Sequence, residues 1–441
     1  MSEQKSRSRL GRVVLLIALA NTSGMIYYLY FLYANGYLPP PFFFDSSNTF
    51  MDLFNPMYWV YDDGRYTDWK SVYPPLNFVI LKLLNIAFMG HTNGDPEFMR
   101  ENSSLLIAGF CFIYLVLPAF VLRTKIWINY TLRQKILIYF AIIFSSPMLF
   151  ALERGNLIIF CPVILAFVLS KGLVRSLSIA VLINFKPYFV LLAFVYLIRR
   201  RWKWLALCIL FSGLICLESG LLVDKNFLRF ITNMFEFSEA SVFSLREVLA
   251  MPSSISAFSY VFRNPDAEML ASMLLGYGVP ISAAGIESVK WLVILSSFAM
   301  LFTKAPIAKD SEIILVLAAV ITNLSNTVGG YSLIFYIPLI PVLITMKYKR
   351  IYVTILSLMA VPLDFIPLLG YYAGEGYSFV SNSYVRINWT LGLGSAVRPI
   401  VNIGLLAAIT CELARRKSIK TSHKSGAFRI DNYKAHEAVT G

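Results

Sequence analysis

Long apolar runs recur along the chain, and several of the short segments between them are basic. A continuous run of about 20 apolar residues can cross a bilayer as a helix. The pattern therefore predicts an all-α, polytopic membrane bundle of about twelve spans. The expected spans are residues 13–33, 104–122, 136–151, 157–170, 174–186, 187–199, 203–222, 286–303, 311–326, 331–346, 351–370 and 393–412.

The apolar run 76–89 is an exception, because it is short and contains Lys82. Counting it as a span would place the basic segment 123–135 on the outer side of the membrane. We predict instead an interfacial or re-entrant helix, entered through the two prolines at positions 74 and 75. The first outer loop then extends from about residue 34 to 103.

Composition and charge agree with this threading. Residues are 57% hydrophobic and 15% charged, whereas soluble proteins carry about 25% charged residues. The net charge of +14 would suit nucleic acid, but 26 of the 39 Lys and Arg lie in the predicted inner segments, with only 6 of the 25 Asp and Glu. This is the positive-inside pattern. We expect a lipid bilayer as partner, no nucleic acid, and both termini in the cytoplasm.

Three further segments fall on the outer side, at residues 223–285, 323–331 and 373–390. The basic stretch 415–441 is expected to be a disordered cytoplasmic tail, which leaves 1–414 as one membrane domain. The five cysteines lie in apolar runs without paired spacing. Neither disulfides nor a metal site is expected from them.

The first outer loop concentrates carboxylates beside the first span. They are Asp45, Asp52, Asp62, Asp63 and Asp68. Such a loop indicates chemistry at the bilayer surface, and the alternative is an ordinary solvated loop. Asp52 is the preferred catalytic base because its apolar neighbours, Phe50-Met51 and Leu53-Phe54, favour a partly apolar cleft. Asp45 and Asp63 are the next candidates.

Two cations are expected on the same side. Arg154 lies in a charged turn between two apolar runs, and Lys186 lies where two runs meet before Pro187. A charge beside a span needs a partner, and two cations at this depth can hold a lipid phosphate. The alternatives are an ion pair of Arg154 with Glu153 or another outer carboxylate, and extension of Lys186 to the membrane interface.

Motifs of the common enzyme classes are missing from the sequence. There are three histidines, two of them in the tail, and no P-loop, Gly-x-Ser-x-Gly, dinucleotide fingerprint or metal-binding pattern. Carboxylate acid–base chemistry supported by Arg and Lys remains. This combination suits sugar transfer from a phosphate to a hydroxyl, because a carboxylate takes the acceptor proton and cations stabilise the leaving phosphate.

An ordered series of short motifs extends over about residues 10–350. It consists of Asp52-Leu-Phe-Asn, Gly64-Arg-Tyr66, Tyr73-Pro-Pro-Leu76, Arg154-Gly155-Asn156, Lys186-Pro187, Arg199-Arg-Arg-Trp-Lys203 and Gly330-Tyr331-Ser-Leu-Ile-Phe-Tyr-Ile-Pro-Leu339. The series resembles glycosyltransferase family 87, membrane enzymes of the GT-C fold class that include polyprenyl-phosphate-mannose-dependent mannosyltransferases. The chain departs from that family at Asn156, where Gln is frequent, and at Gly330, where His is frequent.

The resemblance implies inverting transfer of a hexose, mannose or glucose, on the outer face of a bacterial inner membrane. It implies a polyprenyl-phosphate-linked donor, a glycan or glycolipid acceptor, and no cofactor. By position, Asp52 matches the general base. Arg154 and Lys186 are then expected to contact phosphate. The other expected substrate contacts are Asn156, Tyr66, Tyr73 and Tyr331.

Two other functions stay open at this point. A surface-polysaccharide polymerase or ligase is also polytopic but relies on arginine-rich outer loops, whereas the outer loops here are net acidic. A lipid-linked sugar transporter without chemistry is expected to show internal repeats and broken helices around a midplane site. No long repeat is evident in this sequence.

Overall fold

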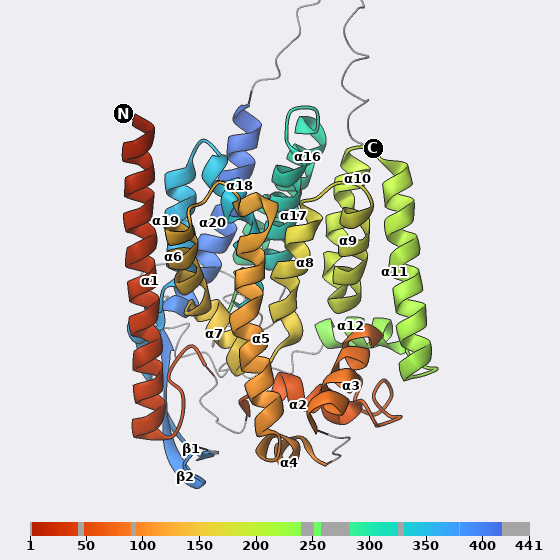
Figure 1. Cartoon of the computed structure of the whole chain (residues 1–441), viewed down its shortest axis with the longest axis vertical. Helices are drawn as coiled ribbons and strands as arrows, with labels where there is room; N and C mark the ends of the chain where they lie inside the picture. Colours follow the sequence, from red (N-terminus) through yellow and green to blue (C-terminus); the bar gives the residue numbers. More distant parts are fainter. Residues whose placement is uncertain are drawn as a thin grey trace, which may run out of the picture.

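The structure, a computed structural model, describes residues 2–42, 48–89, 94–239, 251–256, 283–324, 330–378 and 380–416. Within these ranges the chain is a bundle of helices aligned roughly along the long axis of the molecule (Figure 1). The expected tail beyond residue 416 and the candidate base Asp45 lie outside the described residues.

Among the described residues, five helices are long and apolar enough to cross a membrane. They are α1 (Ser2–Asn35, of which Gly11–Asn35 is apolar), α5 (Ser104–Arg123), α11 (Trp202–Val223), α16 (Ala283–Lys304) and α20 (Leu393–Arg415). This confirms a helical membrane protein. A sixth span results if α6 (Leu132–Ile143) and α7 (Ser146–Glu153), which meet at 54°, count as one.

The other predicted spans are short helical segments. They are η3 (Leu157–Phe160), α8 (Cys161–Val168), α9 (Leu173–Phe185), η4 (Pro187–Ala193), α10 (Phe194–Ile198), α17 (Asp310–Leu324), η6 (Gly330–Leu339), α18 (Ile340–Thr345) and α19 (Lys349–Ala360). Part of their length comes from 3-10 winding, which rises about 2.0 Å per residue against about 1.5 Å in an α-helix. The 10 residues of η6 and 6 of α18 thus extend about 29 Å.

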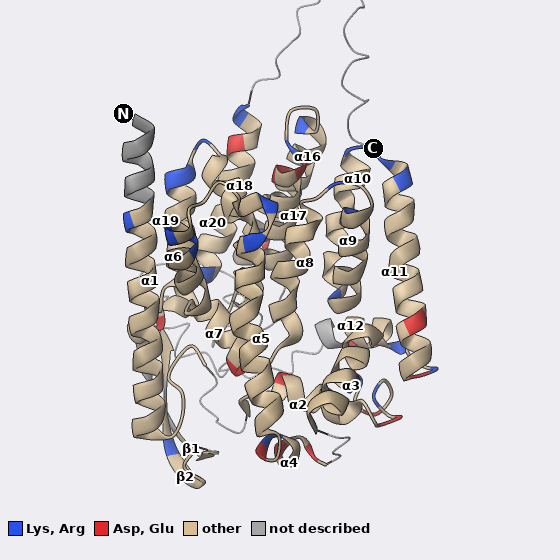
Figure 2. Cartoon of the chain, viewed as in Figure 1, with Lys and Arg blue, Asp and Glu red and all other residues tan. Residues whose placement is uncertain are grey.

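One end of the bundle carries the helices of the first predicted outer loop, α2 (Met51–Trp59), α3 (Pro75–Met89) and α4 (Pro96–Glu101), together with α12 (Arg229–Glu239) (Figure 1). There α3 packs against α2, α5 and α11. It stays at this end rather than running the length of the bundle (Figure 1). Most Asp and Glu gather here, and most Lys and Arg gather at the opposite end (Figure 2).

The structure corrects the predicted span 351–370, while the chain as a whole remains predominantly helical. Helix α19 ends at Ala360, shortly before Pro362, which cannot continue the backbone hydrogen bonding of a helix. The chain then forms an antiparallel hairpin of β1 (Pro367–Ser378) and β2 (Ser383–Gly392), which contains the predicted outer segment 373–390. Apolar periodicity could not distinguish the end of a membrane helix from the start of a strand here.

A buried ion pair fixes the base of this hairpin to the last helix. Asp364, in η7 (Leu363–Phe365), accepts two hydrogen bonds from the Arg398 guanidinium of α20, one of them 2.8 Å long between Nη1 and Oδ1. Both side chains are completely buried. Gly394 leaves the room they need, because a Cβ there would lie 2.4 Å from Asp364 Oδ1.

Candidate active site

The first turn of α2 holds Asp52, and it is joined by backbone hydrogen bonds to the turn that follows α7. The Phe50 amide donates to the Glu153 carbonyl oxygen at 2.7 Å, and the Asp52 amide donates to the Arg154 carbonyl oxygen at 3.0 Å. Phe50 itself adopts a left-handed backbone conformation, with φ of 63°. The two segments therefore form one unit that fixes the position of Asp52 against Arg154.

Gly155 is required in this unit for two reasons. Its φ is +67°, a conformation that costs an L-residue about 1–2 kcal/mol. A Cβ at this position would also lie 2.8 Å from Leu53 Cβ and 3.0 Å from Phe50 Cδ1. The close approach of the two segments thus depends on the missing side chain.

The Asp52 carboxylate is held at both oxygens. Arg154 Nη2 lies 2.7 Å from Oδ1, and Asn156 Nδ2 lies 2.8 Å from Oδ2. Arg154 also donates through Nη1 to the Asn48 carbonyl oxygen at 2.8 Å. Asn156 is oriented in turn by its Oδ1, which accepts a hydrogen bond from the Ile158 amide at the start of η3. The carboxylate is thereby oriented, while its side chain stays 21% exposed.

Lys186 lies at the break between α9 and η4, where Pro187 prevents the helix from continuing. Its ammonium group lies 4.5 Å from the centre of the Tyr73 ring. Burial raises the pKa of the Tyr73 phenol well above its ordinary value, so the ring remains neutral and presents a π face to the cation. The Asp52 carboxylate is close enough to act electrostatically on the same ammonium.

No described residue forms a hydrogen bond or an ion pair with the Lys186 ammonium, so the cation–π contact is its main stabilisation within the described chain. A partly buried cation that forms no ion pair is energetically unfavourable. The site can therefore take up an anionic group beside Asp52.

Asn77 fixes the loop that carries Tyr73 to the loop that carries Lys186. Its Nδ2 donates to the Asn184 and Phe185 carbonyl oxygens, at 3.4 and 3.1 Å, at the end of α9. Asn77 was not among the predicted site residues. The available signal was an Asn inside the apolar run that forms α3, since an amide buried there needs hydrogen-bond partners.

Tyr331 borders the site from the start of η6. Its ring stacks on Phe150 of α7, with centroids 5.8 Å apart, and it lies within electrostatic range of Asp52 and Arg154. The preceding Gly330 donates from its amide to the Met251 carbonyl oxygen at 2.6 Å. A Cβ on residue 330 would lie 2.1 Å from that oxygen, so no side chain fits where the resembling family often has His.

The remaining predicted residues lie apart from Asp52. Asp63 is exposed and lies beyond the far end of α2, which is about 10 Å of helix from Asp52. Asp62 closes a turn, and hydrogen bonds from the Trp69 indole and the Gly64 amide lower the pKa of its carboxyl. Tyr66 is buried and donates to the Tyr73 carbonyl oxygen at 3.2 Å, so it supports the loop instead of facing a ligand.

Glu153 is a second carboxylate next to the site that sequence reasoning did not select. It is buried, and its Oε1 accepts a hydrogen bond from Thr49 at 3.0 Å. Its Oε2 has no hydrogen-bond partner among the described residues. Glu153 directly precedes Arg154, so the sequence suggested only an ion pair between these two neighbours.

Comparisons with known proteins identify no relative: no family model, curated protein or solved structure matches this chain.

Proposed function

We propose that this chain is a membrane glycosyltransferase that moves a hexose from a polyprenyl-phosphate carrier to a hydroxyl of a glycan or glycolipid. The reaction takes place at the outer face of a bacterial inner membrane. One observation carries the proposal: an oriented carboxylate, Asp52, lies near a cation, Lys186, that forms no ion pair with any described residue.

The chemistry assigned to these groups is a displacement at the anomeric carbon. Asp52 accepts the proton of the acceptor hydroxyl as its oxygen bonds to that carbon, and the carbon–oxygen bond to phosphate breaks on the opposite side. The leaving phosphate keeps the electron pair, and Lys186 stabilises its charge. The configuration of the sugar is inverted.

Arg154 has a different role in this proposal from the phosphate contact expected on sequence grounds. Its guanidinium already donates to Asp52 and to the Asn48 carbonyl oxygen. We assign it to orienting the base, so Lys186 becomes the main phosphate contact.

Membranes from cells that express the chain test the proposal directly. They are incubated with radiolabelled polyprenyl-phosphate mannose or glucose, and labelled products are separated from the donor. The expected result is a new labelled glycan or glycolipid that membranes containing Asp52→Asn do not form. Uptake of donor into vesicles without a new product would indicate a transporter and overturn the proposal. So would equal product formation by Asp52→Asn.

A further inference from the structure

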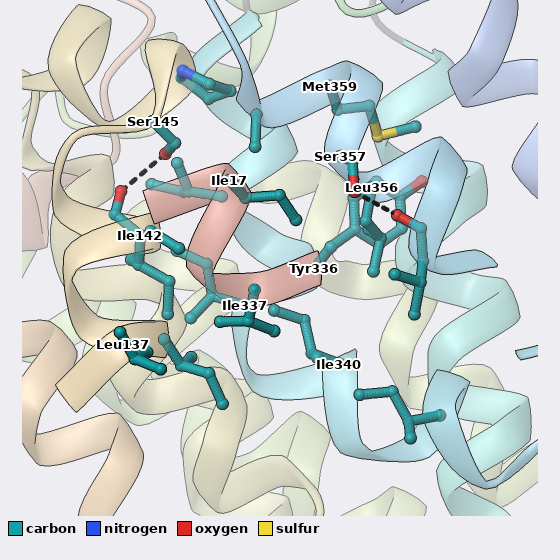
Figure 3. A pocket seen from close by; sticks show the side chains of 18 of the residues that line it. Ile17, Leu137, Ile142, Ser145, Tyr336, Ile337, Ile340, Leu356, Ser357 and Met359 are labelled. Atoms are coloured by element: carbon teal, nitrogen blue, oxygen red, sulfur yellow. Dashed lines mark hydrogen bonds between the residues drawn. The ribbon is translucent and has the colours of Figure 1, made fainter. Parts of the chain in front are cut away.

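A partly open apolar cavity lies between helices of the bundle, away from Asp52. This cavity has a volume of about 140 Å³ and lies between α1, α6, η6, α18 and α19 (Figure 3). Branched aliphatic side chains make up much of its wall. They include Ile17, Leu137, Ile142, Ile337, Ile340 and Leu356.

Three of the polar side chains around the cavity already have hydrogen-bond partners. Ser145 donates its hydroxyl hydrogen to the Ile142 carbonyl oxygen, and Ser357 donates to the Val353 carbonyl oxygen, each at 2.7 Å (Figure 3). The Tyr336 hydroxyl donates to Asn402 Oδ1, also at 2.7 Å. The surface of the cavity is therefore largely hydrocarbon. An apolar cavity of about 150 Å³ stays free of water and binds a six-carbon ring.

Two elements connect the cavity with the candidate active site. Pro147 lines the cavity, and α7 runs from it to Arg154, about 10 Å further along the helix. Leu333 also lines the cavity and lies two residues beyond Tyr331 in η6. The near wall of the cavity therefore lies about two helical turns from the residues around Asp52.

The far wall lies much deeper. Gln134 lines it, and about 16 Å of α6 separates Gln134 from Ser145. With the 54° bend between α6 and α7, this wall is about 23 Å from Arg154. One leaflet of the hydrocarbon core is about 15 Å thick. A lipid whose phosphate binds beside Arg154 and Lys186 fills the cavity as far as this wall only if its chain is longer than one leaflet.

We propose that the cavity binds an isoprene unit far from the phosphate in a polyprenyl donor, and so makes the enzyme select long-chain donors over short ones. This inference rests on the proposed function. The size fits, since one branched five-carbon unit is comparable to the six-carbon ring that such a volume holds. The depth also fits a polyprenyl chain better than the acyl chain of an ordinary outer-leaflet phospholipid.

The test compares hexosyl donors on phosphates of a 55-carbon and a 10-carbon polyprenol. Wild-type protein is expected to prefer the long donor in kcat/KM. Two variants that fill the cavity, Ala141→Phe and Ser357→Leu, should lower kcat/KM for the long donor roughly tenfold to a hundredfold and leave the short donor unchanged. Ala108→Phe, on an exposed position of α5, is the matched control and should behave like wild type.

A second measurement separates this inference from the proposed function. Binding of the 55-carbon and 10-carbon polyprenyl phosphates, without sugar, is measured by native mass spectrometry of the purified protein. Selective loss of the long phosphate in both variants supports the cavity, even if wild type transfers no sugar. Equal binding of both phosphates by wild type overturns it, as does an unchanged chain-length ratio in both folded variants.

Discussion

At the scale of single residues, the site is organised around one carboxylate that two partners orient. Asp52 combines two hydrogen-bond donors, Arg154 and Asn156, with partial exposure of its side chain. The neighbouring acids lack this combination, because Asp63 is solvated and Asp62 is committed to its turn. A catalytic base needs both a fixed position and access to the acceptor.

The strongest prediction at this scale concerns Asp52→Asn. The amide keeps the shape of the side chain but cannot take a proton, so transfer should fall by roughly 10²–10⁴. Asp62→Asn and Asp68→Asn should lose much less. Initial rates with equal amounts of membrane-embedded protein provide the measurement. Near wild-type transfer by Asp52→Asn would shift the assignment to another carboxylate, with Glu153 the nearest.

Lys186 gives a prediction about binding. Lys186→Ala should raise the KM for the donor roughly tenfold to a hundredfold, because a charge-assisted contact to phosphate contributes about 1.5–3 kcal/mol. Lys186→Arg should recover part of the affinity. Lys203→Ala, an exposed lysine at the opposite end of the neighbouring helix α11, is the control. If the donor KM of Lys186→Ala equals that of wild type, Lys186 only extends toward the interface.

At the scale of elements, the site depends on the contact between the start of α2 and the turn at residues 153–156. Gly155→Ala should separate them, since the new Cβ would meet Leu53 and Phe50. We expect a loss of about 1–3 kcal/mol in stability and a fall in kcat. Gly213→Ala is the matched control, because nothing lies within 4 Å of a Cβ there. Thermal unfolding in detergent and transfer rates are the two measurements, and equal behaviour of the two variants would contradict the argument.

The buried pair of Asp364 and Arg398 yields a second prediction for elements. Asp364→Asn leaves the Arg398 charge buried without its counterion and should cost about 3–5 kcal/mol. Removing both charges, as Asp364→Leu with Arg398→Met, should restore most of the stability. Thermal unfolding of the single and double variants decides between these outcomes. A double variant as unstable as the single variant would show that the unpaired Arg398 charge does not cause the loss of stability.

Apolar runs allowed most helices to be predicted, but not their internal geometry. The runs around 187–199 and 331–346 are too short to cross a membrane as simple α-helices. The 3-10 winding of η4 and η6 lengthens them, because it has a larger rise per residue. Hydrophobic periodicity does not reveal that change of rise per residue. The hairpin was missed for a related reason, since Tyr and Gly around residue 372 suit several backbone states.

At the scale of the whole molecule, charge separation was the most informative property of the sequence. It indicated which loops share a side, and the structure places Asp52, Arg154 and Lys186 near one another. Asp and Glu gather at the end of the bundle that carries α2, α3 and α4 (Figure 2). The sequence could not specify that Arg154 bonds to Asp52, because 102 residues separate them and either phosphate or carboxylate is a suitable partner.

At this scale we predict the orientation of the chain in the membrane. Asn102→Cys, next to α4, should react with a membrane-impermeant thiol reagent added outside the cell. Asn129→Cys, between α5 and α6, should react only after the membrane is opened. A background with Cys411→Ser removes the exposed native thiol. Labelling of Asn129→Cys from outside would invert the orientation and place the Asp52 site in the cytoplasm.

The Asp364–Arg398 pair also constrains the order in which the protein assembles. Arg398 lies six positions inside the Gly392–Leu393 boundary of α20, and an unpaired arginine within a membrane helix costs at least about 2.5–3.5 kcal/mol. During synthesis Asp364 emerges first, followed by the hairpin and then the last helix. Helix α20 therefore partitions into lipid most favourably once the hairpin has folded back and delivered the Asp364 carboxylate, so hairpin closure precedes or accompanies insertion of the final span.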